Sequence, residues 1–467
     1  MKTIAFLLVI TLSKVSYSQT PTPLPNNLQE FLAAIDDCLS TNPVNGKCTS
    51  SEYGEMPEWD VSNVTNMQQA FVIKTDFNVD ISKWNTANVL YMPDMFNGAE
   101  NFNQDISGWN TNKVTTMNGM FYNALSFNQP LNDWDVSNVT EMSNMFVNAS
   151  AFNQTLNNWD VSNVTNMNSM FLEASFFNGD ISNWDTSNVT DMGGMFLEAI
   201  KFNQDIDGWN VSGVTTMEEM FSGTINFNQD LNSWDVSRVV DMSYMFESAI
   251  SFNGNISNWT INTNSIIMLG MFENAIAFNQ PIGQWDVSQV TNMYKMFSEA
   301  YLFNQNLENW NISSVGNMTS MFDDSGLSTD NYDALLIGWA QLDLNSSPSN
   351  ITLGASNINY CTGGDAKQSL IENKGWTIND AGLDCATAGG DDQNQLDISI
   401  YPNPTSNKIY IRGNYTQLKV VIYNILGKEI LNKSITNSLD ISHLDSGIYI
   451  LQLSDGMKLS NQRIIKN

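Results

Sequence analysis

Residues 134–156 read W-D-V-S-N-V-T-E-M-S-N-M-F-V-N-A-S-A-F-N-Q-T-L, and close variants of this stretch recur along more than half of the chain. Each copy contains one tryptophan, and successive tryptophans are 25 residues apart, with one interval of 26. A fixed period of this length is typical of a solenoid, in which each repeat buries its apolar face against the next. The tryptophans are Trp59, Trp84, Trp109, Trp134, Trp159, Trp184, Trp209, Trp234, Trp259, Trp285 and Trp310.

The pattern inside one repeat predicts a short strand followed by a short helix. Trp134 and Val136 alternate with polar neighbours, which is the period of a strand. Apolar residues then recur at offsets of three, four and seven, the spacing of one helix face. These are Met142, Met145, Phe146 and Ala149. The predicted fold class is therefore an α/β repeat solenoid of short parallel strands and short helices, followed by a small all-β sandwich.

Breaks in the period and in composition predict six segments. The expected segments are a signal peptide at 1–18, an N-terminal cap at 19–58, eleven repeats at 59–322, a C-terminal cap at 323–386, a linker at 387–395 and a β domain at 396–467. Lys2, the apolar run that follows it and Ser16-Tyr17-Ser18 have the order of a secretory signal. That apolar run is too short to cross a membrane, and no later segment reaches 18 apolar residues. We therefore expect an exported chain with no membrane span after cleavage.

Charge is distributed unevenly along the chain. The formal net charge is −30, and residues 59–322 contain 27 acidic side chains against six basic ones. An array this acidic repels phosphate backbones, so nucleic acid is excluded as an expected partner. Cations, basic proteins and neutral glycans remain compatible with the charge.

The four cysteines flank the repeats. An exported chain retains disulfides, and we expect Cys38–Cys48 and Cys361–Cys385, each holding one end cap together. In the loop-entropy model each bridge stabilises by roughly 3 kcal/mol. Free thiols or a metal site are the alternatives, and the lack of nearby histidine weakens the metal alternative.

An acidic residue often follows the tryptophan, and strand alternation would place it on the outside. The functional interpretation is a glycan-binding or calcium-assisted face, on which neighbouring carboxylates raise one another's pKa or recruit a cation. The local interpretation, which we favour, is that each carboxylate accepts backbone N–H groups at a turn. No other metal or cofactor is expected. The candidate row consists of Asp60, Asp135, Asp160, Asp185, Asp235 and Asp286.

An asparagine follows the last phenylalanine of every repeat. A polar residue repeated beside the core is expected to satisfy backbone groups, so we predict a stacked ladder that bonds to the loop of the neighbouring repeat. A ligand-binding role is the less favoured alternative. The ladder includes Asn103, Asn128, Asn153, Asn178, Asn203 and Asn228.

Two resemblances extend this interpretation. D-V-S-N-V-T-N-M (160–167) and M-F-x-x-A-x-x-F-N-Q-D-I (195–206) resemble the BspA-like surface proteins, a bacterial branch of the leucine-rich-repeat class. The asparagine usual after the strand of a leucine-rich repeat is valine here. Y-P-N-P (401–404), N-I-L-G (424–427) and S-G-I-Y (446–449) resemble the type A sorting domain of the type IX secretion system. That resemblance implies recognition of residues 396–467 by the type IX machinery of a Bacteroidota-type bacterium, which leaves the cargo surface-attached or released.

Three functional classes follow from these observations. The first is an adhesin or binding module whose array contacts an extended glycan or extracellular protein. The second is a structural surface or biofilm protein, which differs from an adhesin by self-association. The third and least favoured is a polysaccharide-acting enzyme, because the acids are regular and no repeat departs from the pattern to build a carboxylate pair. We therefore expect no enzymatic activity.

Overall fold

The computed structural model describes residues 22–48, 51–261, 264, 266–342, 351–385, 398–401, 405, 407–413, 415, 417–424, 429–455 and 459–466. They belong to two compact units, Met1–Cys385 and Ala386–Asn467, which are described separately. The expected signal peptide and linker lie outside the described residues.

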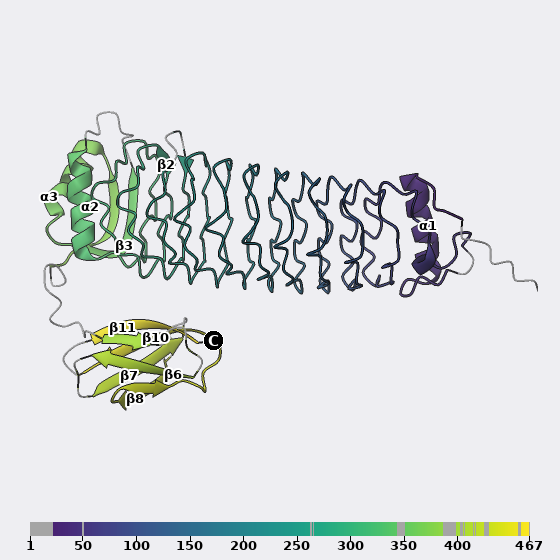
Figure 1. The fold of residues 1–467 in the computed structure, drawn as a ribbon. Coiled ribbons are helices and arrows are strands. Elements are labelled where there is room, and N and C mark those ends of the chain that lie inside the picture. Colours follow the sequence, from purple (N-terminus) through teal and green to yellow (C-terminus); the bar gives the residue numbers. More distant parts are fainter. Residues whose placement is uncertain are drawn as a thin grey trace, which may run out of the picture. The chain divides into compact units, whose positions relative to one another are not determined.

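Each 25-residue repeat forms one coil, and the coils of residues 59–322 stack in order between two caps (Figure 1). Equivalent residues of successive coils pair in parallel through isolated bridges, such as Thr116↔Glu141 and Glu141↔Asn166. The short strands β1 (Ile266–Ile267) and β2 (Val290–Asn292) continue the same row of parallel pairs. Backbone pairing between coils therefore connects the whole array.

The expected strand at Trp134–Val136 and the expected helix over the Met-Phe segment are both wrong in detail. The parallel bridge falls at Glu141 instead of at the tryptophan. Among the described residues of 59–322, none is helical. The Met-Phe segment is a series of tight turns, in which Met145 N–H donates to Met142 O and Ala149 N–H donates to Phe146 O.

Some backbone N–H groups of these turns bond to carbonyl groups of the next coil. Asn144 N–H donates to Asn168 O at 2.9 Å, and Asn148 N–H donates to Leu172 O at 2.7 Å. Asn144 and Asn148 both have positive φ, a conformation that a continuous right-handed helix cannot contain. Two four-residue turns place apolar side chains at the same offsets as one helix face. The sequence spacing alone therefore does not distinguish the two structures.

Aromatic side chains stack along the interior of the array. Trp134 lies 6.4 Å from Trp109 between ring centroids, and Phe146 lies 5.4 Å from Phe121, both with nearly parallel planes. The tryptophan Nε1–H groups donate to a carbonyl of the preceding coil, as Trp134 does to Ile106 O at 3.1 Å. The methionine and phenylalanine rows are fully buried. The interior is thus a continuous core shared by all coils.

The N-terminal cap is built on α1 (Leu28–Thr41), followed by the short 3₁₀ helix η1 (Met56–Glu58). Asn27 starts α1 by accepting the N–H groups of Gln29 and Glu30. The apolar face of α1 covers the first coils, with the Phe31 ring 6.1 Å from that of Trp84. The Cys38–Cys48 bridge closes this cap, as expected.

The C-terminal cap contains α2 (Thr329–Gln341), β3 (Thr352–Tyr360), α3 (Gly364–Lys374) and β4 (Thr377–Leu383). Strands β3 and β4 are parallel, and β3 joins the bridge row through Met318↔Leu353. Trp339 in α2 continues the tryptophan row by donating to Leu307 O. The Cys361–Cys385 bridge closes this cap. Figure 1 shows α1 at one end of the stack and α2, α3 and β3 at the other.

The second unit consists of two sheets around one apolar core. Four strands pair in the order β11-β10-β7-β8, with bounds Leu459–Lys466, Gly447–Ser454, Leu418–Asn424 and Glu429–Ile435. Three strands pair in the order β5-β6-β9, with bounds Ile398–Tyr401, Lys408–Gly413 and Ser438–Asp440. All pairings between these strands are antiparallel.

Candidate binding surfaces of the repeat array

The aspartates that follow the tryptophans lie at the surface, where each caps a local turn. Asp135 Oδ1 accepts the backbone N–H of Ser137 at 3.1 Å and its hydroxyl at 2.6 Å. Exposure is high for the whole candidate row except Asp60, which is half-buried. The same oxygen-to-N–H contact with the serine two residues later occurs at Asp60, Asp135, Asp160, Asp185, Asp235 and Asp286.

These turns lower the pKa of two aspartates of the row. The hydroxyl and N–H of Ser237 lower the pKa of Asp235, and those of Ser288 lower the pKa of Asp286. At these two positions the pKa is therefore lowered, and the rise that the less favoured functional interpretation implied does not occur. Asn210 forms the same turn with Ser212, so the position requires an acceptor oxygen and not a charge.

A second row of the same kind, not predicted from the sequence, lies elsewhere on the coils. Asp105 accepts the N–H of Ser107 at 2.9 Å, and the hydroxyl of Ser107 lowers the pKa of Asp105. Asp80 does the same with Ser82. The repeated spacing D-x-S, which also marks the first row, was the available signal. Within the described part of the chain, no group of three or more His, Cys, Asp or Glu side chains is placed to hold a metal ion.

The asparagine row is a ladder of side-chain to backbone contacts between coils. Asn103 Oδ1 accepts the N–H of Asn128 at 2.9 Å, and it also accepts Nε2–H of Gln129 at 2.9 Å. Gln129 Nε2 donates to Asn103 O as well. The contact between consecutive asparagines repeats at Asn103, Asn128, Asn153, Asn178, Asn203 and Asn228, and it continues to Asn304. The amide oxygens are thus occupied within the array.

Exposed apolar side chains form a third surface feature, which the sequence analysis did not identify. Ile200 is 37 % exposed and Tyr301 is 51 % exposed, and three isoleucines at the equivalent position of the coils between them are half-buried. Their signal in the sequence was an isoleucine two positions before the core phenylalanine in four successive repeats. We call this set the apolar row, and it consists of Ile200, Ile225, Ile250, Ile276 and Tyr301.

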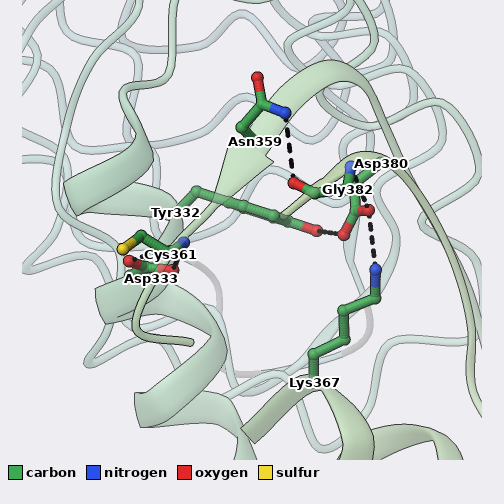
Figure 2. A network of polar contacts seen from close by, with 7 residues as sticks. All are labelled: Tyr332, Asp333, Asn359, Cys361, Lys367, Asp380 and Gly382. Carbon is green, nitrogen blue, oxygen red and sulfur yellow. Dashed lines mark hydrogen bonds and ion pairs between the residues drawn. The ribbon is translucent and has the colours of Figure 1, made fainter. Parts of the chain in front are cut away.

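The C-terminal cap contains a buried polar network (Figure 2). Asp333, which is 4 % exposed, accepts the N–H groups of Cys361, Thr362 and Gly363 at the start of α3. A carboxylate at a helix N-terminus is favoured by the helix dipole and the free N–H groups there. Asp333 therefore joins α2 to α3 and to the disulfide at Cys361.

A second buried carboxylate holds the other side of the cap, as Figure 2 shows. Asp380 accepts the hydroxyl of Tyr332 at 3.1 Å and forms an ion pair with Lys367 at 2.7 Å. Burial, reinforced by the charge of Asp380, raises the pKa of Tyr332, which keeps the phenol protonated. Tyr332 lies in α2, Lys367 in α3 and Asp380 in β4, so these contacts hold the three elements together.

Comparison with known proteins gives two family matches. The family described as Mycoplasma protein of unknown function, DUF285, matches residues 41–158, 140–259 and 226–335, which together cover more than half of the chain. The family described as secretion system C-terminal sorting domain matches residues 399–467. No curated protein matches the chain.

The second match confirms the expected sorting domain and indicates secretion or surface attachment by the type IX route. It places the small β unit in the export pathway, so that the repeats are the cargo. Among the described residues, no helix is long and apolar enough to cross a membrane.

Proposed function

Because the chain belongs to the family described as Mycoplasma protein of unknown function, DUF285, and ends in a secretion sorting domain, we propose that it is an exported adhesin whose repeats bind an extended partner. The partner is a glycan or an extracellular protein. The repeats act as a solenoid of the leucine-rich-repeat class, related to the BspA-like surface proteins, in which stacked coils present rows of identical side chains.

One observation carries this proposal, namely that exposed side chains recur at equivalent positions of successive coils. Asp135, Asp160 and Asp185 occupy one such row in three consecutive coils, and all three are exposed. Coils spaced like parallel strands give eleven repeats a face of roughly 50 Å. A face of that length suits a partner that is itself extended or repetitive.

A structural role in a surface layer is the second candidate, favoured by the same regularity because identical rows also suit contact with further copies. An enzymatic role has less support. The aspartates that follow the tryptophans accept hydrogen bonds from serines of their own turns. The buried carboxylates of Asp333 and Asp380 lie in the C-terminal cap, where each accepts hydrogen bonds from several donors. A substrate would have to displace these contacts.

A binding screen of the purified chain tests the proposal. The chain is presented to glycans and extracellular proteins, once with calcium and once with a chelator. A matched variant replaces Asp135, Asp160, Asp185 and Asp235 by Asn, which removes four charges and keeps the acceptor oxygen that Asn210 supplies naturally. We expect at least one partner.

The outcomes separate the candidates. Loss of binding in the folded Asn variant places the contact on the aspartate row, and loss in chelator alone indicates a bridging calcium ion. The absence of any partner together with concentration-dependent self-association favours the structural role. The absence of both contradicts the proposal.

A further inference from the structure

The apolar row is a continuous surface feature and not a set of isolated exposures. Asn226 N–H donates to Ile200 O at 3.2 Å, and Leu302 N–H donates to Ile276 O at 3.2 Å. The row is therefore fixed by backbone bonds between coils. Phe176, 61 % exposed, and Leu302, 45 % exposed, lie one position further along their coils, beside the row near its two ends. Contiguous apolar surface of this kind on a soluble protein marks interaction sites.

Backbone hydrogen bonds join successive coils at the row, so its members recur at about the spacing of parallel strands, roughly 4.8 Å. An α-helix advances about 5.4 Å per turn, so a helix lying along the row brings about one apolar side chain to each coil. Four steps between coils span about 19 Å, the length of a helix of about 13 residues.

Within each of four coils, an acidic side chain precedes the member of the apolar row by two or three residues. Glu198 and Glu299 are exposed and precede row members by two residues, while Glu247 and Glu273 precede them by three. Burial raises the pKa of Glu247, and the charges of Glu273 and Glu219 in the neighbouring coils raise it further, so acids of successive coils share one negative field.

Few basic side chains offset this field. Lys295 pairs with Glu273 at 2.6 Å, so its charge is used within the array. Lys201 is exposed beside Ile200, at the edge of the row away from the acids. The surface thus combines an apolar strip with an acidic border.

Resting on the proposed function, we propose that this face binds a basic amphipathic helical segment of a protein partner. Its apolar side chains cover the apolar row, and its Lys or Arg side chains face Glu198, Glu247 and Glu299. Complementary charge speeds the encounter and selects among partners. A second copy of the array would bring acid against acid, and an anionic glycan would be repelled, so both are disfavoured occupants.

The test uses a labelled 18-residue amphipathic peptide with Leu on one face and Lys and Arg on the other. Its Kd for the full chain is measured by fluorescence anisotropy at low and high salt. The comparison peptide has the same Leu face with Glu in place of Lys and Arg. We expect the basic peptide to bind at least tenfold more tightly than the acidic one, and to weaken at high salt.

Two sets of variants locate the contact. Glu198→Gln with Glu247→Gln and Glu299→Gln should weaken binding at least tenfold. The control, Asp80→Asn with Asp105→Asn and Asp180→Asn, removes the same number of charges from the second row of turn-capping aspartates and should change Kd less than twofold. Ile200→Ser with Tyr301→Ser, both at exposed positions, should also weaken binding at least fivefold.

The inference is overturned by equal losses in the glutamate and aspartate variants, which would indicate diffuse charge attraction. It is also overturned by unchanged binding of the Ile200 and Tyr301 variant, or by no binding of the basic peptide. A glycan partner found in the binding screen, with no peptide binding here, would leave the proposed function standing and remove only this inference.

Discussion

At the scale of single residues, the side-chain oxygens of Asp and Asn supplement the backbone hydrogen bonds that join successive coils. Asp235 closes its own turn through Ser237, whereas Asn203 bonds to the next coil through Asn228. Both rows were recognisable in the sequence from recurrence. Whether the oxygens were used internally or offered to a ligand was not, because the same atoms serve both purposes.

Asp235 provides a test of the turn. Replacement by Asn keeps the acceptor and should lower stability less than Ala does, whereas Ala should cost about 1 kcal/mol through the lost hydrogen bonds. The midpoint of urea denaturation measures both. Equal losses for Asn and Ala would show that the charge, and not the acceptor, holds the turn.

The same residue predicts a pH dependence. The pKa of Asp235 is lowered in the folded chain by Ser237, so its contribution is complete above the ordinary carboxyl pKa. It is lost as pH falls through the lowered value. The difference in stability between the natural chain and the Asp235→Asn variant should therefore shift toward the variant in acid. A difference that is constant between pH 7 and pH 3 would contradict this.

Asn203 tests the ladder between coils. Its Oδ1 accepts the N–H of Asn228 and Nε2–H of Gln229, both at close range. Ala leaves these donors without that acceptor and should cost about 1–3 kcal/mol, while Asp keeps the oxygen and should cost less. Hydrogen exchange at the Asn228 amide reports the local effect, and unchanged exchange in the Ala variant would refute the ladder as a stabilising feature.

At the scale of elements, the apolar spacing identified the buried faces correctly but not the backbone that carries them. Met142, Met145, Phe146 and Ala149 are all fully buried. Two turns carry these residues, and the other N–H groups of the turns bond to the next coil. The backbone conformation therefore depends on the neighbouring coil and is not determined by the sequence of one repeat. The caps were placed by the cysteines and the loss of period, but Asp333 gave no local signal because its donors lie about 30 residues further along the chain.

Asp333 should be the most sensitive single residue of the C-terminal cap. Ala leaves three N–H groups at the start of α3 without their acceptor, one of them buried at Gly363, and we expect a loss of about 3 kcal/mol. Asn retains one acceptor oxygen and should lose less. Thermal unfolding followed with hydrogen exchange in α3 measures this, and an Ala variant as stable as the natural chain would contradict the assignment.

At the scale of the whole molecule, the fixed period predicted one coil per repeat, and the motifs of the last 70 or so residues predicted the sorting unit that the family comparison confirms. The apolar row was not predicted, because outward and inward positions alternate irregularly along turns and only the folded coil shows which isoleucines are exposed. The structure therefore adds most where function depends on the surface.

The two units should unfold independently. Their cores contain separate sets of residues, so deleting residues 386–467 should leave the melting temperature of the repeat unit within about 2 °C of its original value. The same deletion should abolish export. Calorimetry and cell fractionation measure the two effects, and a large drop in melting temperature would show that the sorting unit stabilises the repeats.

The central claim is that an extended partner contacts equivalent positions of successive coils. Hydrogen exchange of the full chain with and without a bound partner tests it most directly. We predict new protection that recurs at intervals of 25 residues across at least four consecutive coils. Protection confined to one coil or to a cap would contradict the account.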